Sequence, residues 1–202
     1  MNEGAPSRRA ALSVALASRS PRRRQLLESL GLKVVQIASR YDEEEHADRY
    51  ADAREMVLAH ARGKAALADG SGPALLVAAD TDVVIDGDIL GKPRDAAEAA
   101  AMLRRLSGKT HIVHTGFAVI DRTRDVSQDG VESARVTFLE LNEEQLARYI
   151  ASGEPFDKAG AYGIQGRGAL LVASIDGDFY TVMGLPLARL GRAFASLGYD
   201  LL

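Results

Sequence analysis

Two serines and four arginines stand where an apolar stretch, residues 11–17, gives way to the segment SRSPRRR. The serine–proline pair predicts that a buried strand passes here into a helix. Positive charge at the amino end of a helix opposes the helix dipole, at a cost of about 0.3 to 1 kcal/mol for each surface residue. Free backbone N–H groups, hydroxyls and guanidinium groups are nevertheless well suited to phosphate oxygens. The side chains that could act in this way are Ser18, Ser20, Arg22 and Arg23.

A basic run of this kind is usually a solvated helix face. This run follows a strand, however, and open α/β sheets bind their ligands at the carboxyl ends of the strands. We therefore expect a phosphate site in the turn. If Arg22 and Arg23 serve the ligand and not the fold, replacing either one should weaken phosphate binding without loss of stability.

A carboxylate stands at the end of a second apolar run. The segment LLVAAD, residues 75–80, predicts a buried strand with Asp80 at its carboxyl edge. A carboxylate in that place could bind a hard divalent cation or accept a proton from water. A further acidic cluster, residues 42–45, is by itself typical of a solvated loop. Lys64 and Lys92 would ordinarily be surface lysines, and the chain has no G-x-x-x-x-G-K-[ST] phosphate loop.

The remaining sequence alternates between strand and helix patterns. Serine, aspartate and asparagine before apolar periodic segments predict helix starts, and Asn142 with Gln145 and Asp95 with Glu98 fit the capping box. Asp86-Gly87 between apolar flanks predicts a tight hairpin. The expected helices span residues 21–30, 52–69, 95–106, 143–152 and 186–197. The expected strands span 11–17, 33–38, 75–80, a hairpin at 83–90, 111–121, 131–141 and 169–175, with an acidic loop at 41–48 and a glycine-rich segment at 156–168.

These elements predict an α/β protein with a mixed sheet. The chain has 202 residues, of which 47% are hydrophobic and 26% charged, a composition that favours one globular domain. We expect residues 1–10 to be a ragged N-terminus and residues 11–202 to form a single domain with two lobes around a cleft. The net charge of -3 argues against a nucleic-acid partner, and the absence of cysteine excludes disulfides and thiolate metal sites. No apolar run is long enough to span a membrane, so we expect a cytoplasmic protein.

Several ordered motifs resemble the Maf family of nucleoside triphosphate pyrophosphatases. They are LASRSPRRRQLLESLGL, DEE, GKA, AADTDVVIDGDILGKP, LRRLSGKTHIVHTG, GEPFDKAGAYGIQGRGA and GLPL. The resemblance implies an elongated mixed sheet flanked by helices, two lobes around a central cleft, and frequent homodimers. It also implies metal-dependent hydrolysis of a nucleotide to the monophosphate and pyrophosphate.

Within that family, the chain resembles the branch that acts on dTTP and UTP. That branch has arginine after Ser-Pro, threonine after the catalytic aspartate and glutamine in a Y-G-I-Q-G loop, as this chain has Arg22, Thr81 and Gln165. The branch that acts on 7-methyl-GTP typically has tryptophan, glutamine and glutamate in these places. Asp82 departs from the family pattern, because an apolar residue is more usual there.

The resemblance also implies a role for each site residue. Asp80 would be the proton acceptor or metal-bound base, and Glu43 the second carboxylate at a divalent cation, Mg²⁺ or Mn²⁺. Thr81 and Gln165 would read the base. The triphosphate and the charge growing on the leaving pyrophosphate would be held by Ser18, Ser20, Arg22, Arg23, Lys64 and Lys92.

Two other functions remain open at this point. LLVAADTDVV also resembles the D-x-D motif of haloacid-dehalogenase-type phosphatases, in which Asp80 would be a nucleophile. That motif normally lies on the first strand, whereas here a phosphate-binding turn precedes it. The Maf family is also associated with septum formation, so a non-catalytic regulator of cell division that senses nucleotides is the third hypothesis.

Overall fold

A single mixed sheet of seven strands forms the framework of the protein. The computed structural model describes residues 12–43, 50 and 52–202. The strand order is β2-β1-β3-β5-β6-β7, and β4 pairs with β3. Strands β2, β1 and β3 are parallel, whereas β4, β5, β6 and β7 pair with their neighbours in antiparallel fashion. The strands are β1 (Ser13–Leu16), β2 (Lys33–Gln36), β3 (Leu75–Ile85), β4 (Asp88–Leu90), β5 (Thr110–Asp121), β6 (Val126–Phe138) and β7 (Val172–Asp176).

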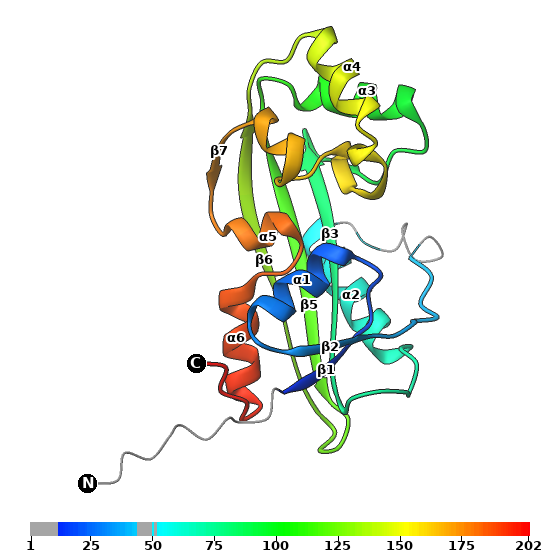
Figure 1. The fold of residues 1–202 in the computed structure, drawn as a ribbon, viewed down its shortest axis with the longest axis vertical. Coiled ribbons are helices and arrows are strands. Elements are labelled where there is room, and N and C mark those ends of the chain that lie inside the picture. The colour runs from blue at the N-terminus through cyan, green and yellow to red at the C-terminus, as the bar shows by residue number, and fades with distance from the viewer. Residues whose placement is uncertain (1–11, 44–49, 51) are drawn as a thin grey trace, which may run out of the picture.

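Helices gather around the two ends of this sheet. Figure 1 shows α3 and α4 together at one end of the long strands, with α1, α2 and α6 toward the other. No helix in the described part of the chain is long and apolar enough to cross a membrane. The α-helices are α1 (Pro21–Ser29), α2 (Ala53–Ala66), α3 (Ala96–Leu106), α4 (Glu143–Ala151), α5 (Phe179–Met183) and α6 (Leu187–Ser196), and the 3₁₀ helices are η2 (Glu154–Asp157), η3 (Ala159–Ala161) and η4 (Gly166–Leu171).

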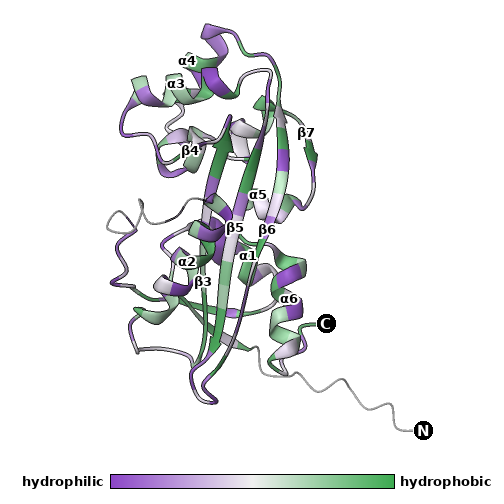
Figure 2. Cartoon of the chain, turned by 180° about the vertical axis from the view of Figure 1, so that it is seen from behind, coloured by the Kyte–Doolittle hydropathy of each residue, from purple (hydrophilic) through white to green (hydrophobic). Residues whose placement is uncertain are grey.

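Each end of the sheet has its own apolar core. Phe117 and Phe194 belong to one core, which joins β1, β3 and β5 to α1, α5 and α6. Leu103 and Phe138 belong to the other, which joins the far ends of β3, β5 and β6 to α3 and α4. Green apolar segments on the strands mark both cores in Figure 2. The two cores are the physical basis of two lobes on one sheet.

One edge of β3 changes partner along its length. Strand β5 pairs with one side of β3 over nearly its whole length, from Leu75 to Val84. On the other side, β1 pairs with β3 only as far as Val77, and β4 begins to pair at Val83. Between these points, at residues 78–82, no described strand pairs with that edge. The sheet therefore has a gap beside the middle of β3.

The predicted α/β class, the mixed sheet and the flanking helices are confirmed. The hairpin is confirmed as well, with Asp86 and Gly87 at positive φ between β3 and β4. The capping box at Asn142 and Gln145 is complete. At α3 only half of the box forms, since Asp95 accepts from the backbone N–H of Glu98, but the Glu98 side chain accepts from Arg94.

Several predicted boundaries are wrong. A strand that ends at Asp80 is wrong, because pairing with β5 carries β3 on through Val84 and pairing with β4 extends it to Ile85. Strand β6 is shifted toward its amino end relative to the predicted 131–141, because a short turn joins it directly to β5. The first half of the predicted strand 169–175 is 3₁₀ helix. The short helix α5 lacked a sequence prediction. Residues 1–10, predicted to be a ragged N-terminus, and residues 44–48 of the predicted acidic loop lie outside the described residues.

Candidate active site

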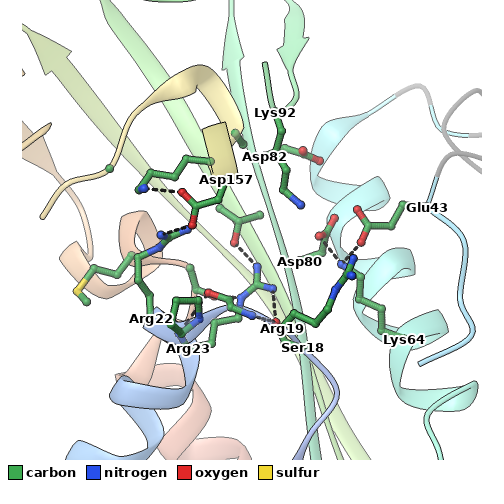
Figure 3. Close-up of a pocket in the computed structure, with 18 of the residues that line it drawn as sticks. Ser18, Arg19, Arg22, Arg23, Glu43, Lys64, Asp80, Asp82, Lys92 and Asp157 are labelled. Atoms are coloured by element: carbon green, nitrogen blue, oxygen red, sulfur yellow. Dashed lines mark hydrogen bonds and ion pairs between the residues drawn. The ribbon is translucent and has the colours of Figure 1, made fainter. Parts of the chain in front are cut away.

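A cleft of about 1060 Å³ opens at the gap beside β3. Its walls come from the turn between β1 and α1, from the middle of β3, from α2, and from the segment around η2 and η3. Six basic and four acidic side chains line it. Figure 3 shows most of them directed into one space. An excess of positive charge in a concave site favours an anionic ligand.

Asp80 lies at the floor of this cleft, in the middle of β3 and on the face that α2 covers. Its Oδ1 accepts a hydrogen bond from Lys64 Nζ at 2.6 Å, and its Oδ2 lies 3.0 Å from His60 Nδ1. Both partners come from α2, where they are one helical turn apart. The Asp80 side chain is only 10% exposed. A buried carboxylate is thus held by two separate donors.

Small residues allow α2 to approach the sheet at this point. Gly116 of β5 pairs directly with Asp80, and a Cβ at Gly116 would lie 2.4 Å from the carbonyl oxygen of Val57. Ala78 and Ala118, on the same face of the sheet, are buried against α2 through Ala65. Because the helix backbone lies so close, the side chains of His60 and Lys64 reach the strand.

The surroundings of Asp80 set its charge. Burial acts to raise the pKa of this carboxyl, but the hydrogen bond from His60 and the positive charges of Lys64 and Arg23 outweigh burial, and the pKa lies well below its ordinary value. Asp80 is therefore an anion at neutral pH. A carboxylate with so low a pKa is a weak base until its donors are drawn away.

Three side chains here could hold a metal ion. Glu43, His60 and Asp80 each offer one ligand atom, and these atoms lie within 4.8 Å of one another. The two carboxylates suit Mg²⁺ or Mn²⁺, whereas an imidazole is more typical of softer divalent metals. The same two carboxylates hold Lys64, whose Nζ is 2.6 Å from Glu43 Oε1 and from Asp80 Oδ1. A bound metal cation would therefore compete with the Lys64 ammonium for the carboxylates of Glu43 and Asp80.

The arginine-rich turn forms the opposite wall. Ser20 is the N-cap of α1, where its Oγ accepts from the backbone N–H of Arg23. Ser18 Oγ accepts from the backbone N–H of Ser20 and from Arg23 Nη1. The helix start thus has the form that the Ser-Pro pair predicts.

Arg23 is held by the protein itself. Its Nε donates to the carbonyl oxygen of Gly184 at 2.8 Å, and its Nη1 donates to that of Ala79 at 2.8 Å. Its Nη2 donates to Thr81 Oγ1 at 2.9 Å. The Ala79 carbonyl lies in the gap of the sheet, where no described strand supplies a donor. Arg23 therefore satisfies an open strand edge, which explains why the sequence places positive charge against the helix dipole.

The other basic side chains of the cleft differ in whether they already have partners within the protein. Arg22 pairs with Asp157 at 3.0 Å. Arg19 and Lys92 line the cleft and make no hydrogen bond or ion pair with any residue that the structure describes. Both side chains extend into the space beside Asp80 in Figure 3. They are the cations most available to an incoming anion.

The two side chains expected to read a base lie in different surroundings. The hydroxyl of Thr81 lines the cleft but is occupied, since it accepts from Arg23 and lies 2.9 Å from Thr115 Oγ1. Gln165 is exposed and is not in the cleft wall, although its neighbours Gly163 and Ile164 are. The structure brings Ser18, Ser20, Arg22, Arg23, Glu43, Lys64, Asp80, Thr81 and Lys92 together around one cleft, and leaves Gln165 at its margin.

Asp82 also faces α2, two residues beyond Asp80 on the same strand. Its Oδ2 is buried and has no hydrogen-bond partner among the described residues. Burial, followed by the negative charge of Asp80, raises the pKa of Asp82 to about 7. The departure from the family pattern thus places a further carboxyl group in the site, beside those of Asp80 and Glu43.

Sequence reasoning missed three residues of the site: His60, Arg19 and Asp157. For His60 a signal was present, because it precedes Lys64 by four residues within the predicted helix 52–69, and such residues share a helix face. Arg19 lies within the quoted turn but carried no prediction of its own. Asp157 had no signal, since its pairing with Arg22 joins residues 135 positions apart.

Comparison with known proteins shows what this chain as a whole is similar to. The family model described as "Maf-like protein" matches residues 13–197. A protein of Moorella thermoacetica named dTTP/UTP pyrophosphatase is 51% identical over 187 residues, which cover 92% of this chain and 95% of the relative. Proteins with the same name from a Geobacillus species and from Dictyoglomus thermophilum are 47% and 43% identical, over 91% and 94% of this chain and 97% and 98% of their own lengths.

Proposed function

This chain belongs to the Maf family, and from that premise we propose that it is a nucleoside triphosphate pyrophosphatase. It hydrolyses dTTP and UTP to the nucleoside monophosphate and pyrophosphate. The names of its relatives support this substrate class. The observation that carries the proposal is the position of Asp80, an anionic carboxylate between the Lys64–Glu43 pair and the arginine-rich turn.

The basic side chains of the cleft are suited to a triphosphate. Among the described residues, Arg19 and Lys92 have no hydrogen-bond or ion-pair partner, and Arg22 pairs with one exposed carboxylate, that of Asp157. We assign these three cations to the phosphates. Ser18, Ser20 and Arg23 shape the turn that presents the cations, and Arg23 retains a second Nη2 N–H for a phosphate oxygen. Positive groups placed where the leaving pyrophosphate gains charge stabilise the transition state.

Lys64 links substrate binding to the basicity of Asp80. In the free protein its ammonium lies between the carboxylates of Asp80 and Glu43. If a triphosphate draws the ammonium toward its oxygens, Asp80 loses a donor and its pKa rises. Asp80 then becomes a better acceptor for the proton of a water molecule that attacks the α-phosphorus. The site would thus activate its base only when the nucleotide is present.

A divalent cation fits the acceptors beside Asp80. We propose that Glu43 and Asp80 hold Mg²⁺ or Mn²⁺, and the oxygen-rich donor set supports this choice. When bound, such a cation would withdraw charge from phosphate oxygens and lower the pKa of bound water. Lys64 remains close enough to neutralise whichever carboxylate charge the cation leaves.

Our proposals for base recognition, domain organisation, oligomeric state and location rest on the family resemblance. We propose that Thr81 and Gln165 favour a pyrimidine base, with Thr81 acting through the position of Arg23. We also propose a single domain over residues 11–202 and a cytoplasmic homodimer that binds neither nucleic acid nor membranes. The net charge of -3 supports the absence of a nucleic-acid partner.

Product analysis tests the proposed function. The protein is incubated with dTTP, UTP, CTP, GTP, ATP and 7-methyl-GTP, with Mg²⁺ or Mn²⁺, and pyrophosphate and orthophosphate are measured separately. We expect pyrophosphate from dTTP and UTP, and no turnover by Asp80→Asn, whose side chain keeps the shape but not the charge. Release of orthophosphate, a phosphoaspartate on Asp80, or wild-type turnover by a folded Asp80→Asn protein would contradict the proposal.

A further inference from the structure

We propose that His60 is a positioning residue for Asp80: it donates from Nδ1 to one carboxylate oxygen and so fixes the direction of the other. The inference rests on the proposed function, because it concerns the carboxylate to which that function assigns the proton transfer. His60 does not line the cleft. It acts from behind Asp80, on the side of α2.

Two donors on two sides determine how the carboxylate of Asp80 is turned. Nδ1 of His60 lies 3.0 Å from Oδ2, and Nζ of Lys64 lies 2.6 Å from Oδ1. The torsion that turns a carboxylate is broad, so a single donor leaves its orientation poorly defined. Lys64 has a second acceptor in Glu43 and faces the ligand space. When Lys64 turns to a phosphate, His60 is the donor that still holds Asp80.

The state of the imidazole follows from its partner. Asp80 is ionised and only accepts, so the ring nitrogen that faces it must carry the proton. The other nitrogen, Nε2, is buried and has no partner among the described residues. A buried polar ring without partners is costly, and the bond to Asp80 is the interaction that offsets this cost for His60. A side chain that served only to fill space would need neither nitrogen.

Neighbouring aromatic rings hold the imidazole in place. The rings of Tyr41 and Tyr50 lie 5.7 Å and 5.9 Å from that of His60, centroid to centroid. Tyr41 can lie against α2 because residue 63 is glycine, where a Cβ would come within 2.2 Å of the Tyr41 ring. The side chain of His60 is 5% exposed. A ring fixed on several sides gives its hydrogen bond a fixed direction.

A positioning role and a ligand role predict different losses. His60 also offers a nitrogen to the group that Glu43 and Asp80 form. Loss of a metal ligand weakens the binding of the cation and is overcome at higher cation concentration. Loss of a positioning hydrogen bond lowers kcat at saturating cation and leaves the binding of the cation nearly unchanged. Outer hydrogen bonds of this kind are worth about 10- to 100-fold in activity.

Three substitutions separate the hydrogen bond from the shape of the side chain. His60→Asn places an amide nitrogen where Nδ1 lies, His60→Gln carries it one bond further, and His60→Leu has similar bulk without a donor. We expect kcat for dTTP to fall about 10- to 100-fold in His60→Leu, with KM changed less than about threefold. We expect His60→Asn to recover most of kcat and His60→Gln to recover little.

Met56→Ala is the matched control for a loss of packing. Met56 is buried one turn before His60 on α2 and does not line the cleft. This variant should lower the melting temperature as much as His60→Leu or more, yet keep the wild-type kcat well below that temperature. Equal losses of kcat in His60→Asn and His60→Leu would overturn the proposal. So would a defect that higher Mn²⁺ restores, or a Kd for Mn²⁺ that rises with the loss of kcat.

A measurement that needs no turnover keeps the inference separate from the proposed function. ¹⁵N NMR of the imidazole nitrogens in the nucleotide-free protein should show a proton on Nδ1 of His60, with a signal that moves in Asp80→Asn. An Nδ1 without a proton overturns the positioning role even in an active enzyme. A wild-type protein that hydrolyses no nucleotide overturns the proposed function and leaves this measurement valid.

Discussion

Gly116 of β5 lies directly across from Asp80 of β3, and the backbone of α2 packs directly against Gly116. Because Gly116 has no side chain, α2 lies close enough for His60 and Lys64 to donate hydrogen bonds to Asp80. A Cβ at position 116 would lie 2.4 Å from the carbonyl oxygen and 2.5 Å from the carbonyl carbon of Val57. Backbone atoms cannot turn away as the end of a flexible side chain can.

Gly116→Ala should therefore lower both stability and turnover. The helix must move away from the sheet, which draws His60 and Lys64 from Asp80. We expect a loss of about 1 to 3 kcal/mol in the free energy of unfolding, measured in urea, together with a fall in kcat. Gly191→Ala is the control, because a Cβ there meets nothing within 4 Å and lies in helix α6. A Gly116→Ala protein with wild-type turnover would mean that the donors do not depend on this contact.

Arg22 and Arg23 should respond differently to replacement by alanine. Arg23→Ala leaves the carbonyl oxygens of Ala79 and Gly184 without their guanidinium donor, so we expect a loss of about 2 to 4 kcal/mol in stability. Arg22→Ala removes a partly exposed ion pair and should change stability by less than about 1 kcal/mol. Urea denaturation of both variants tests this contrast, which the sequence alone did not predict. Equal stabilities would show that the bonds of Arg23 contribute little.

Arg19→Ala should weaken the binding of triphosphate with no effect on folding. Arg19 lines the cleft without a partner among the described residues, so its hydrogen bonds remain available to a phosphate. A charge-assisted hydrogen bond of about 1.5 to 3 kcal/mol corresponds to a KM for dTTP about ten times higher or more. Arg24→Ala is the control on the same turn, since Arg24 pairs with Glu28 and lies outside the cleft. Similar KM values for the two variants would remove Arg19 from the site.

Gln165→Glu should change the preference for the base. Uracil and thymine present an N–H donor between two carbonyl acceptors, and a neutral amide can both donate and accept. A carboxylate only accepts, so we expect kcat/KM for dTTP and UTP to fall about tenfold, with a relative gain for guanine nucleotides. Arg167→Ala, in the same exposed segment, should keep the wild-type ranking. An unchanged ranking in Gln165→Glu as well would mean that Gln165 does not contact the base.

Asp82→Asn should raise stability at alkaline pH in metal-free buffer. Burial, then the charge of Asp80, raises the pKa of Asp82 to about 7 in the folded protein, whereas an unfolded aspartate titrates near 4. The folded state holds this proton more tightly, so the contribution of Asp82 to stability falls as pH rises from about 4 to about 7. We expect the free energy of unfolding of the variant to exceed that of the wild type by about 2 kcal/mol at pH 8, and to equal it at pH 4. Urea denaturation at both pH values tests this, and an equal gain at both would exclude titration as the cause.

The local parts of the fold were predictable from sequence because their signals are local. Ser20 with Pro21 predicts the start of α1, and Asp86-Gly87 predicts the hairpin. The type of sheet followed from the order and pattern of the segments. The end of β3 was not predictable from its apolar run, because strand length is set by the partner. Pairing with β5 extends β3 through residues 80–82, which are too polar to continue the apolar run.

The site was predictable as a set of residues but not as a set of bonds. The motifs bring Asp80, Lys64 and Glu43 together through resemblance, whereas the sequence has no signal for the four protein acceptors of Arg23. Those acceptors come from three segments of the chain and from a strand edge that is open only because β1 ends early. Such contacts are properties of the assembled sheet and not of any segment.

The continuity of β3, β5 and β6 through both lobes has a mechanical consequence. Enzymes with two lobes often close around a substrate by rotation about a few loop residues, which act as a hinge. Here the connection between the lobes is the sheet, whose cross-strand hydrogen bonds run without a break from one core to the other. The lobes can approach each other only if the whole sheet bends, through a change in its twist or curvature. The width of the cleft is then an elastic property of three strands, and a substitution far from the cleft that stiffens or flattens them would alter the rate at which nucleotide enters.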